Sequence, residues 1–380
     1  MKPYRIFTLL LALAALSSSA GAATRTRPRL PFTATIHVGD TEYVSGWGSR
    51  DPKTGKHPEG FEAQTHQLLV NLRKLLQRQG LELSNVVHTH AYLTYPGRIA
   101  DFYRVYGEYF PGRPPALTTM GINRLPATEV EITFIASHRP DVTAIHPPNL
   151  ASPGYASPAI RDGAFLYVSD MGLGGSRPGS VADQAREGIA NLESVLRAAG
   201  LGIRDVVKVE IYLTDLEQAE NVDGVLRSVF LTAPPTRTVV GVNELPGGAQ
   251  LAINAIAARG GRRVVAQGVA GTGDQSPAIQ VGSRLFLSGR AGTSRDGVAA
   301  QVREVMDDLG LLLQAAGMGF SQVVKGKVYL TDMDDYAAMN EAYGSYFTDL
   351  FPTRSCIEVG SLPGNAKVAI ALTADASPRR

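Results

Sequence analysis

The stretch Phe351-Pro-Thr-Arg-Ser-Cys-Ile-Glu-Val-Gly-Ser-Leu-Pro363, near the end of the chain, shows how the whole sequence is organised. Two earlier stretches resemble it: APPTRTVVGVNELP over residues 233–246 and RPPALTTMGINRLP over residues 113–126. The Leu-Pro pairs that end the three stretches recur at intervals of 120 and 117 residues. A solenoid repeat is much shorter, about 20–45 residues. The period therefore indicates three copies of a whole domain.

Two further landmarks repeat at the same two intervals. They are the Tyr-Leu-Thr motifs that begin at Tyr92, Tyr212 and Tyr329, and the glutamines Gln64, Gln184 and Gln301. We therefore expect three repeats, over residues 30–138, 155–258 and 275–376. The segments between them, 139–158 and 259–277, are rich in Pro and Gly and are typical of linkers.

Each repeat shows the same succession of patterns. A short apolar strand and a Gly-rich loop precede a long amphipathic helix, which ends at Gly80, Gly200 or Gly317. In the third copy, apolar residues three and four positions apart form one helical stripe: Val302, Val305, Met306, Leu309, Leu312, Leu313 and Ala316. A β-rich strand, a second helix and two final strands complete the unit. This order predicts an α+β fold, in which two helices cover one face of a mixed sheet.

The other face of that sheet is polar in every copy. His88, His90 and Tyr92 alternate onto one face of the middle strand. The corresponding residues of the other copies are Lys208, Glu210, Tyr212, Lys325, Lys327 and Tyr329. We expect this face to meet water or a polar interface. His88 and His90 do not predict a metal site, because no third ligand is identifiable.

Composition excludes some classes of function. Lys and Arg number 37 against 35 Asp and Glu, so the net charge of +2 offers no basic surface for nucleic acid or for a lipid headgroup. The single cysteine, Cys356, cannot form an intramolecular disulfide.

The first residues have the pattern of a secretory signal. A short positive segment, Met1–Arg5, precedes an apolar run over Ile6–Leu16 and a small-residue stretch that contains Ala20-Gly-Ala22. The apolar run is shorter than the roughly 20 residues of a membrane-spanning helix. We expect cleavage after Ala22, a periplasmic or secreted location, and no membrane attachment of the mature chain.

The third copy resembles the RidA/YjgF family of small enamine and imine deaminases. The resemblance rests on Ala-Gln-x-Arg, Ala-Ala-Gly, Val-x-Leu-Thr-Asp, Asn-x-x-Tyr and Pro-x-Arg-Ser-Cys within residues 299–363, and at lower quality it extends over the rest of the mature chain. It implies a chorismate-mutase-like fold and a homotrimer with clefts between neighbouring subunits. Three tandem copies would then form an intramolecular pseudo-trimer, and two such units could form a dimer.

The resemblance also implies site residues. An Arg that binds the substrate carboxylate corresponds to Arg354 and Arg237, whereas the first copy has Leu117. A planar guanidinium suits a carboxylate because it donates two parallel hydrogen bonds. The alternative is that each Arg pairs with a structural carboxylate. Further positions expected to bind the substrate are Cys356, Val239, Ser288, Ser169 and Asn340.

A carboxylate that the family uses to position water is expected at Thr133, Asn254 and Ala371, so it is missing from every copy. The nearby Glu131 is expected to point to the opposite face. Two functions therefore stay open. The first is hydrolysis of small imines that carry a carboxylate, without a cofactor or metal. The second is binding of a small carboxylate without chemistry.

Overall fold

The computed structural model describes residues 30–171, 179–232, 234–266 and 275–380. The proposed signal peptide lies outside the described residues, as do parts of the Gly-rich loop of the second repeat and of the second linker. All helices and strands named below belong to the compact unit Pro31–Arg380. Among the residues that the structure covers, no helix has the length and apolarity needed to cross a bilayer.

The first repeat forms one mixed sheet of five strands with two helices. Its elements are β1 (Thr35–Val38), β2 (Thr41–Val44), α1 (Phe61–Arg78), β3 (Val86–Leu93), α2 (Ile99–Tyr109), β4 (Ala116–Gly121) and β5 (Val130–Ser137). The strand order is β1-β2-β5-β3-β4, and only β3 and β4 are parallel. The predicted α+β unit is thus confirmed.

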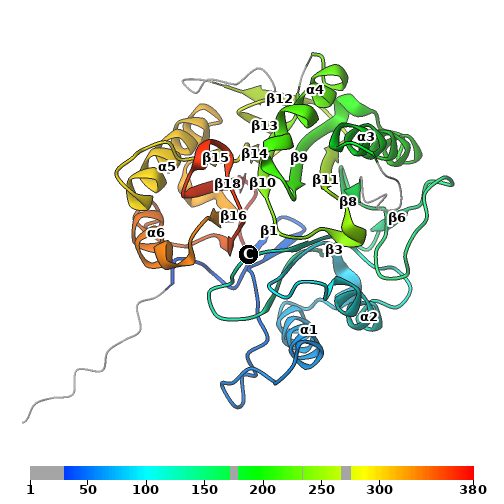
Figure 1. Cartoon of the computed structure of the whole chain (residues 1–380), viewed down its shortest axis with the longest axis vertical. Helices are drawn as coiled ribbons and strands as arrows, with labels where there is room; N and C mark the ends of the chain where they lie inside the picture. Colours follow the sequence, from blue (N-terminus) through cyan, green and yellow to red (C-terminus); the bar gives the residue numbers. More distant parts are fainter. Residues whose placement is uncertain (1–29, 172–178, 233, 267–274) are drawn as a thin grey trace, which may run out of the picture. The chain divides into compact units, whose positions relative to one another are not determined.

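The second and third repeats have the same plan. The second contains β6 (Thr143–Ile145), β7 (Ala159–Asp162), β8 (Phe165–Met171), α3 (Val181–Ala198), β9 (Val206–Leu213), α4 (Ala219–Val229), β10 (Thr236–Gly241) and β11 (Leu251–Ala258). The third contains β12 (Arg262–Val265), β13 (Ala278–Val281), β14 (Arg284–Leu287), β15 (Arg290–Ala291), α5 (Val298–Ala315), β16 (Val323–Leu330), α6 (Tyr336–Gly344), β17 (Thr353–Glu358) and β18 (Val368–Asp375). Figure 1 shows each pair of helices beside the sheet of its own repeat.

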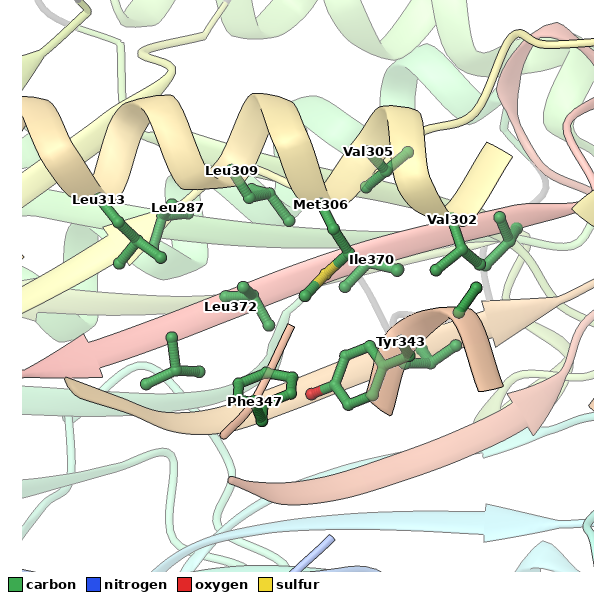
Figure 2. Close-up of a cluster of buried hydrophobic side chains, with 14 of the residues drawn as sticks. Leu287, Val302, Val305, Met306, Leu309, Leu313, Tyr343, Phe347, Ile370 and Leu372 are labelled. Carbon is green, nitrogen blue, oxygen red and sulfur yellow. The ribbon is translucent and has the colours of Figure 1, made fainter. Parts of the chain in front are cut away.

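The predicted stripe of α5 faces the third sheet. Figure 2 shows Val302, Met306 and Leu309 pointing from the helix toward β18, where they meet Ile370 and Leu372. All are buried. Since burying an aliphatic side chain contributes roughly 1.5–3 kcal/mol, this stripe explains why the helix lies on the sheet.

Parts of the predicted linkers are strands. β6 pairs with β7, and β12 pairs with β13, so each linker adds an edge strand to the sheet of the repeat that follows. The C-terminal residues do the same for the first repeat: the Gly39 amide donates to the Pro378 carbonyl, and the Arg380 amide donates to the His37 carbonyl. The three repeats are therefore joined in a closed ring.

The polar faces of the three sheets meet one another, which is one of the two environments expected for them. Glu210 of the second repeat lies 2.7 Å from Nζ of Lys327, 3.1 Å from Nζ of Lys208 and 2.9 Å from Nε2 of His90. Burial alone would raise the pKa of Glu210, but the ammonium groups of Lys208 and Lys327 outweigh burial and hold this pKa well below its ordinary value. This buried ionic cluster ties the three repeats together.

Candidate active site

Three equivalent contacts mark the boundaries between repeats. In each, a serine near the end of a second strand accepts a hydrogen bond from the backbone amide of the arginine position of the preceding repeat, which holds Leu117, Arg237 or Arg354. The pairs are Leu117 with Ser169, Arg237 with Ser288, and Arg354 with Ser45, each at 2.9 Å. The three boundaries are therefore formed by the first and second, second and third, and third and first repeats. They are the places where the family resemblance predicts clefts, and each is called a cleft below.

The serine hydroxyls are also donors within their own repeats. Ser45 donates to the Thr33 carbonyl, Ser169 to the Ser157 carbonyl and Ser288 to the Ser276 carbonyl. Each hydroxyl thus links a backbone carbonyl of its own repeat to a backbone amide of the preceding repeat. Ser169 and Ser288 thus contact the backbone of Leu117 and Arg237, and their predicted role in substrate binding stays a prediction.

The cleft between the third and first repeats contains Arg354. Its side chain is buried and lies among the aromatic rings of Phe32, Tyr336 and Tyr343, whose centroids are 5.4, 5.8 and 5.2 Å from the guanidinium carbon. Its hydrogen-bond partners are the Tyr336 hydroxyl at 3.4 Å and the sulfur of Met339 at 3.9 Å. Among the residues described, no carboxylate lies within ion-pair distance of Arg354.

Glu131 of the first repeat belongs to the same cleft. Thr133 is opposite His90 and Glu131 is opposite Tyr92 in one strand pairing, so both residues point to the same face. The expectation that Glu131 points to the opposite face is wrong, because residues two positions apart on a strand share a face. The Glu131 carboxylate lies against Gly46, where a Cβ would be only 2.0 Å from Oε1.

Glu131 is a buried carboxyl group without a partner in the described part of the chain. Its Oε1 accepts no hydrogen bond, and the residue is 8% exposed. Burial raises the pKa of Glu131 to about 8, although the positive charges of Arg354 and Lys325 oppose the rise. A carboxyl with this pKa can donate and accept a proton near neutral pH.

Cys356 and Asn340 lie on the Arg354 side of this cleft. Cys356 is two residues after Arg354 on β17 and is buried. Its side chain packs in the hydrophobic core of the third repeat, and burial raises the pKa of its thiol to about 12, which favours the protonated thiol near neutral pH. Asn340 is on α6, and its Oδ1 is buried without a hydrogen-bond partner in the residues covered here.

The cleft between the second and third repeats differs in its arginine. Arg237 donates two hydrogen bonds to Asp223 of its own repeat, at 2.6 and 3.1 Å. The alternative of a structural ion pair therefore holds for Arg237, and its guanidinium does not present a free fork. Val239, two residues further, packs against the hydrophobic core of the second repeat.

The cleft between the first and second repeats has neither an arginine nor a glycine at these positions. Leu117 replaces the arginine, and Asp170 follows Ser169 where the other repeats have Gly46 and Gly289. Among the described residues, those lining its cavity of ≈ 410 Å³ include two acidic side chains, Asp170 and Glu187, and no basic one. The described part of this boundary thus places a leucine where the other two place an arginine.

The sequence pointed to Arg354, Cys356 and Asn340, and the structure brings them together on the third repeat. The sequence analysis did not predict that Glu131 faces this site, nor that the rings of Phe32, Tyr336 and Tyr343 surround Arg354. The strand period of two between Thr133 and Glu131 was the one available signal for the carboxyl group.

The fold and these boundaries define a class: a protein of three α+β units whose clefts are each completed by the next unit. The chain belongs to the RidA/YjgF family, since the family model described as Endoribonuclease L-PSP matches residues 23–138, 148–259 and 267–376. One similar protein is Protein DfrA of Myxococcus xanthus, 40% identical over 107 residues, or 26% of this chain and 82% of the relative.

Two other relatives are similar to a single repeat. The 2-iminobutanoate/2-iminopropanoate deaminase of Mus musculus is 34% identical over 116 residues, or 29% of this chain and 86% of the relative. A RutC family protein of Sulfurisphaera tokodaii is 37% identical over 113 residues, or 29% of this chain and 90% of the relative. These relatives support a RidA-type function in general terms.

Proposed function

We propose that the cleft between the third and first repeats hydrolyses small 2-imino acids, with Arg354 binding the carboxylate and Glu131 transferring protons. The observation that supports this proposal is that Gly46 contacts both Glu131 and the backbone of Arg354, and that among the described residues neither the buried carboxyl nor the buried guanidinium has a partner of opposite charge. The names of the relatives support the reaction type. In the described residues of the other two clefts, these two groups do not occur together.

The roles follow from charge and geometry. A substrate carboxylate would replace the missing anion partner of Arg354 and would receive two charge-assisted hydrogen bonds. The aromatic rings around Arg354 exclude water, which strengthens this attraction. Binding would thus hold the imine carbon at a fixed place relative to Glu131, and such orientation alone accelerates a reaction.

The chemistry needs one proton donor that becomes a proton acceptor. Protonated Glu131 gives its proton to the imine nitrogen, and the resulting carboxylate accepts a proton from the water that attacks the imine carbon. The new C–O bond forms as the C=N π pair moves to nitrogen. Glu131, protonated again, then gives its proton to the amine of the carbinolamine and accepts the proton of the new hydroxyl, so ammonia leaves as the C–N bond breaks and the C=O bond forms. Imine and water thus yield a 2-oxo acid and ammonia without any change in redox state.

Turnover by purified protein tests the proposal. An amino-acid oxidase generates the 2-imino acid in place, and the rate of its disappearance is compared among variants. Glu131→Gln should lower kcat by about 10²–10⁴-fold, as removal of a general acid–base does. Arg354→Ala should mainly raise KM. Arg237→Ala is the matched control, and it should leave kcat/KM unchanged.

The second candidate, a binding protein for a small carboxylate, predicts a different result. It is favoured by the two clefts that lack one or both groups. On that reading, wild-type protein binds a 2-oxo acid through Arg354 but does not speed the loss of the imine. Full activity of a folded Glu131→Gln variant would exclude the catalytic role of this residue.

A further inference from the structure

Three side chains of the first repeat gather at the hairpin end of β1 and β2, away from Ser45 and its cleft. They are His37 on β1, Glu42 on β2 and His138 just after β5. One ligand atom from each lies within 4.8 Å of the others. The rings of His37 and His138 stack with centroids 4.0 Å apart and planes 12° apart. Nε2 of His138 is 3.4 Å from Oε2 of Glu42.

Glu42 stands where the other repeats have a core leucine. The strand pairing aligns Glu42 with Ala136, Leu166 with Ala257 and Leu285 with Ala374, which are equivalent pairs. Both leucines are fully buried in hydrophobic cores. Glu42 is also completely buried, and its Oε1 has no hydrogen-bond partner among the described residues. A buried carboxylate is costly unless it is paired or binds a cation.

The two histidines are equally specific to the first repeat. His37 is opposite Glu42, where the other repeats have Arg161 and Gln280. The residue after the last strand is His138 in the first repeat and Arg259 in the second. Two histidines and a glutamate therefore occur together in one repeat, although His138 is far from the other two in sequence. Packing alone does not require this combination, since two repeats fold without it.

The environment of His37 favours a ligand role. Its Nε2 lies 3.1 Å from the Gly39 carbonyl oxygen, to which it can donate, and this leaves the lone pair of Nδ1 available. A ligating histidine commonly donates its other ring N–H to a backbone carbonyl, which fixes the tautomer. The nearby positive charge of Arg139 is offset, because its guanidinium lies 2.9 Å from Asp141 and 3.3 Å from Asp40.

We propose that His37, Glu42 and His138 bind a divalent transition-metal ion, with Zn²⁺ as the best match. Two imidazoles and one carboxylate suit zinc, whereas Ca²⁺ and Mg²⁺ prefer oxygen ligands alone. Three protein ligands leave a fourth position for water or another molecule. The rings must turn out of their stack, because an ion binds in the plane of each imidazole. This site does not depend on the proposed deaminase cleft.

Calorimetric titration of Zn²⁺ into the full chain, stripped with a chelator, tests the site. We expect one strongly bound ion per chain. Glu42→Leu is the decisive variant because it restores the leucine of the other repeats, so it should fold at least as stably as wild type and weaken Zn²⁺ binding at least 100-fold. His37→Gln and His138→Ala should each weaken it at least 10-fold.

The control is His146→Ala, which removes an exposed histidine outside the cluster and should not change the affinity. Substituting Co²⁺ for Zn²⁺ adds a spectroscopic readout, since a bound ion with imidazole ligands shows visible d–d bands that Glu42→Leu should abolish. Binding of Zn²⁺ to Glu42→Leu with wild-type affinity would overturn the proposal. So would the absence of stoichiometric binding to the wild-type chain.

Discussion

At the scale of the residue, the three repeats use one pair of positions in three ways. The arginine position and the helix position that faces it hold Arg354 and Asn340, Arg237 and Asp223, or Leu117 and Tyr103. Asp223 neutralises its arginine, whereas Asn340 cannot, since an amide carries no charge. The difference between Asn340 and Asp223 thus explains why Arg354 has no internal carboxylate partner among the described residues, whereas Arg237 is paired within its own repeat.

The exchange of these residues is the first prediction. Asp223→Asn gives the second repeat the residue of the third, so it should free Arg237 and raise the number of pyruvate-binding sites from about one to two. Asn340→Asp should give Arg354 an internal partner and weaken its site; loss of a charge-assisted pair corresponds to about 1.5–3 kcal/mol, or roughly 10- to 150-fold in affinity. Calorimetric titration measures both, and unchanged stoichiometry and affinity in the two variants would contradict the anchor role.

Glu131 leads to a prediction about pH. Burial raises the pKa of Glu131 to about 8 in the folded state, above its ordinary value of 4.5. The folded state then binds more protons than the unfolded state between these values, so the contribution of Glu131 to stability is lost as pH rises from about 5 to 8. A pKa that differs by one between the folded and unfolded states corresponds to about 1.4 kcal/mol of stability.

At pH 9 the free energy of unfolding of Glu131→Gln should therefore exceed that of wild type by on the order of 2–4 kcal/mol, so the variant should unfold at a higher denaturant concentration. At pH 5 the two proteins should differ little. Urea unfolding at several pH values measures this. Glu59→Gln changes an exposed carboxylate and should leave the pH profile as in wild type. A Glu131→Gln curve parallel to that of wild type would show that Glu131 ionises normally.

The same residues show which features of the site could be predicted from the sequence. Arg354 could be located because the repeats align residue by residue up to the Leu-Pro turn, whereas the serines were located by the family resemblance at the end of the second strand. The direction of Glu131 was also within reach, because Glu131 is two residues from Thr133 and such residues share a face of a strand. Its position against Gly46, near Arg354 of another repeat, was not, because that contact is tertiary. The pair of Arg237 and Asp223, fourteen residues apart, has no local signature either.

At the scale of the element, the helices followed from their periodicity, whereas the edge strands did not. β6 and β12 have three and four residues, and they lie in segments whose Pro and Gly suggested linkers. Such short segments become strands because the next sheet offers unpaired backbone groups at its edge. Their pairing is a tertiary effect, which a window of local sequence does not contain.

The C-terminal pairing with β1 can be tested by truncation. Removing residues 378–380 eliminates the hydrogen bonds between Gly39 and Pro378 and between Arg380 and His37. Each such bond contributes about 0.5–1.5 kcal/mol, so we expect a loss of roughly 1–3 kcal/mol and faster amide exchange in β1. Arg380→Ala keeps the backbone and serves as the control. Unchanged exchange in β1 after truncation would mean that the ring is not closed there.

At the scale of the whole molecule, fusion of the repeats explains their divergence. Identical subunits must carry three identical clefts, whereas a tandem chain can change each cleft separately. Linkage also makes association of the repeats intramolecular. The cleft with Arg354 can therefore keep its two groups while the others lose one or both, and the buried cluster around Glu210 still holds the ring.

We propose that the protein is exported, because residues 1–22 have the pattern of a secretory signal. If the segment that ends at Ala22 is a cleaved signal, protein recovered from the periplasm or medium of its native host should begin at Ala23 or within a residue or two of it. N-terminal sequencing by mass spectrometry decides this. An intact Met1 on the soluble intracellular protein would refute it.

Assembly of the whole chain is the last prediction. A homotrimer of single repeats needs open surfaces where subunits meet, but here those surfaces face one another within the chain. Tyr92, Tyr212 and Tyr329, one from each repeat, are fully buried in a single apolar cluster. No copy of this surface is left for a second chain among the residues covered by the structure, so the mature protein should be compact as a monomer. Light scattering after size exclusion should report one chain, slightly below the 40.4 kDa of the full sequence, or a dimer through a different surface. A trimer of chains that never yields a compact monomer would contradict the closed ring, because each repeat would then have to find its neighbours in other chains.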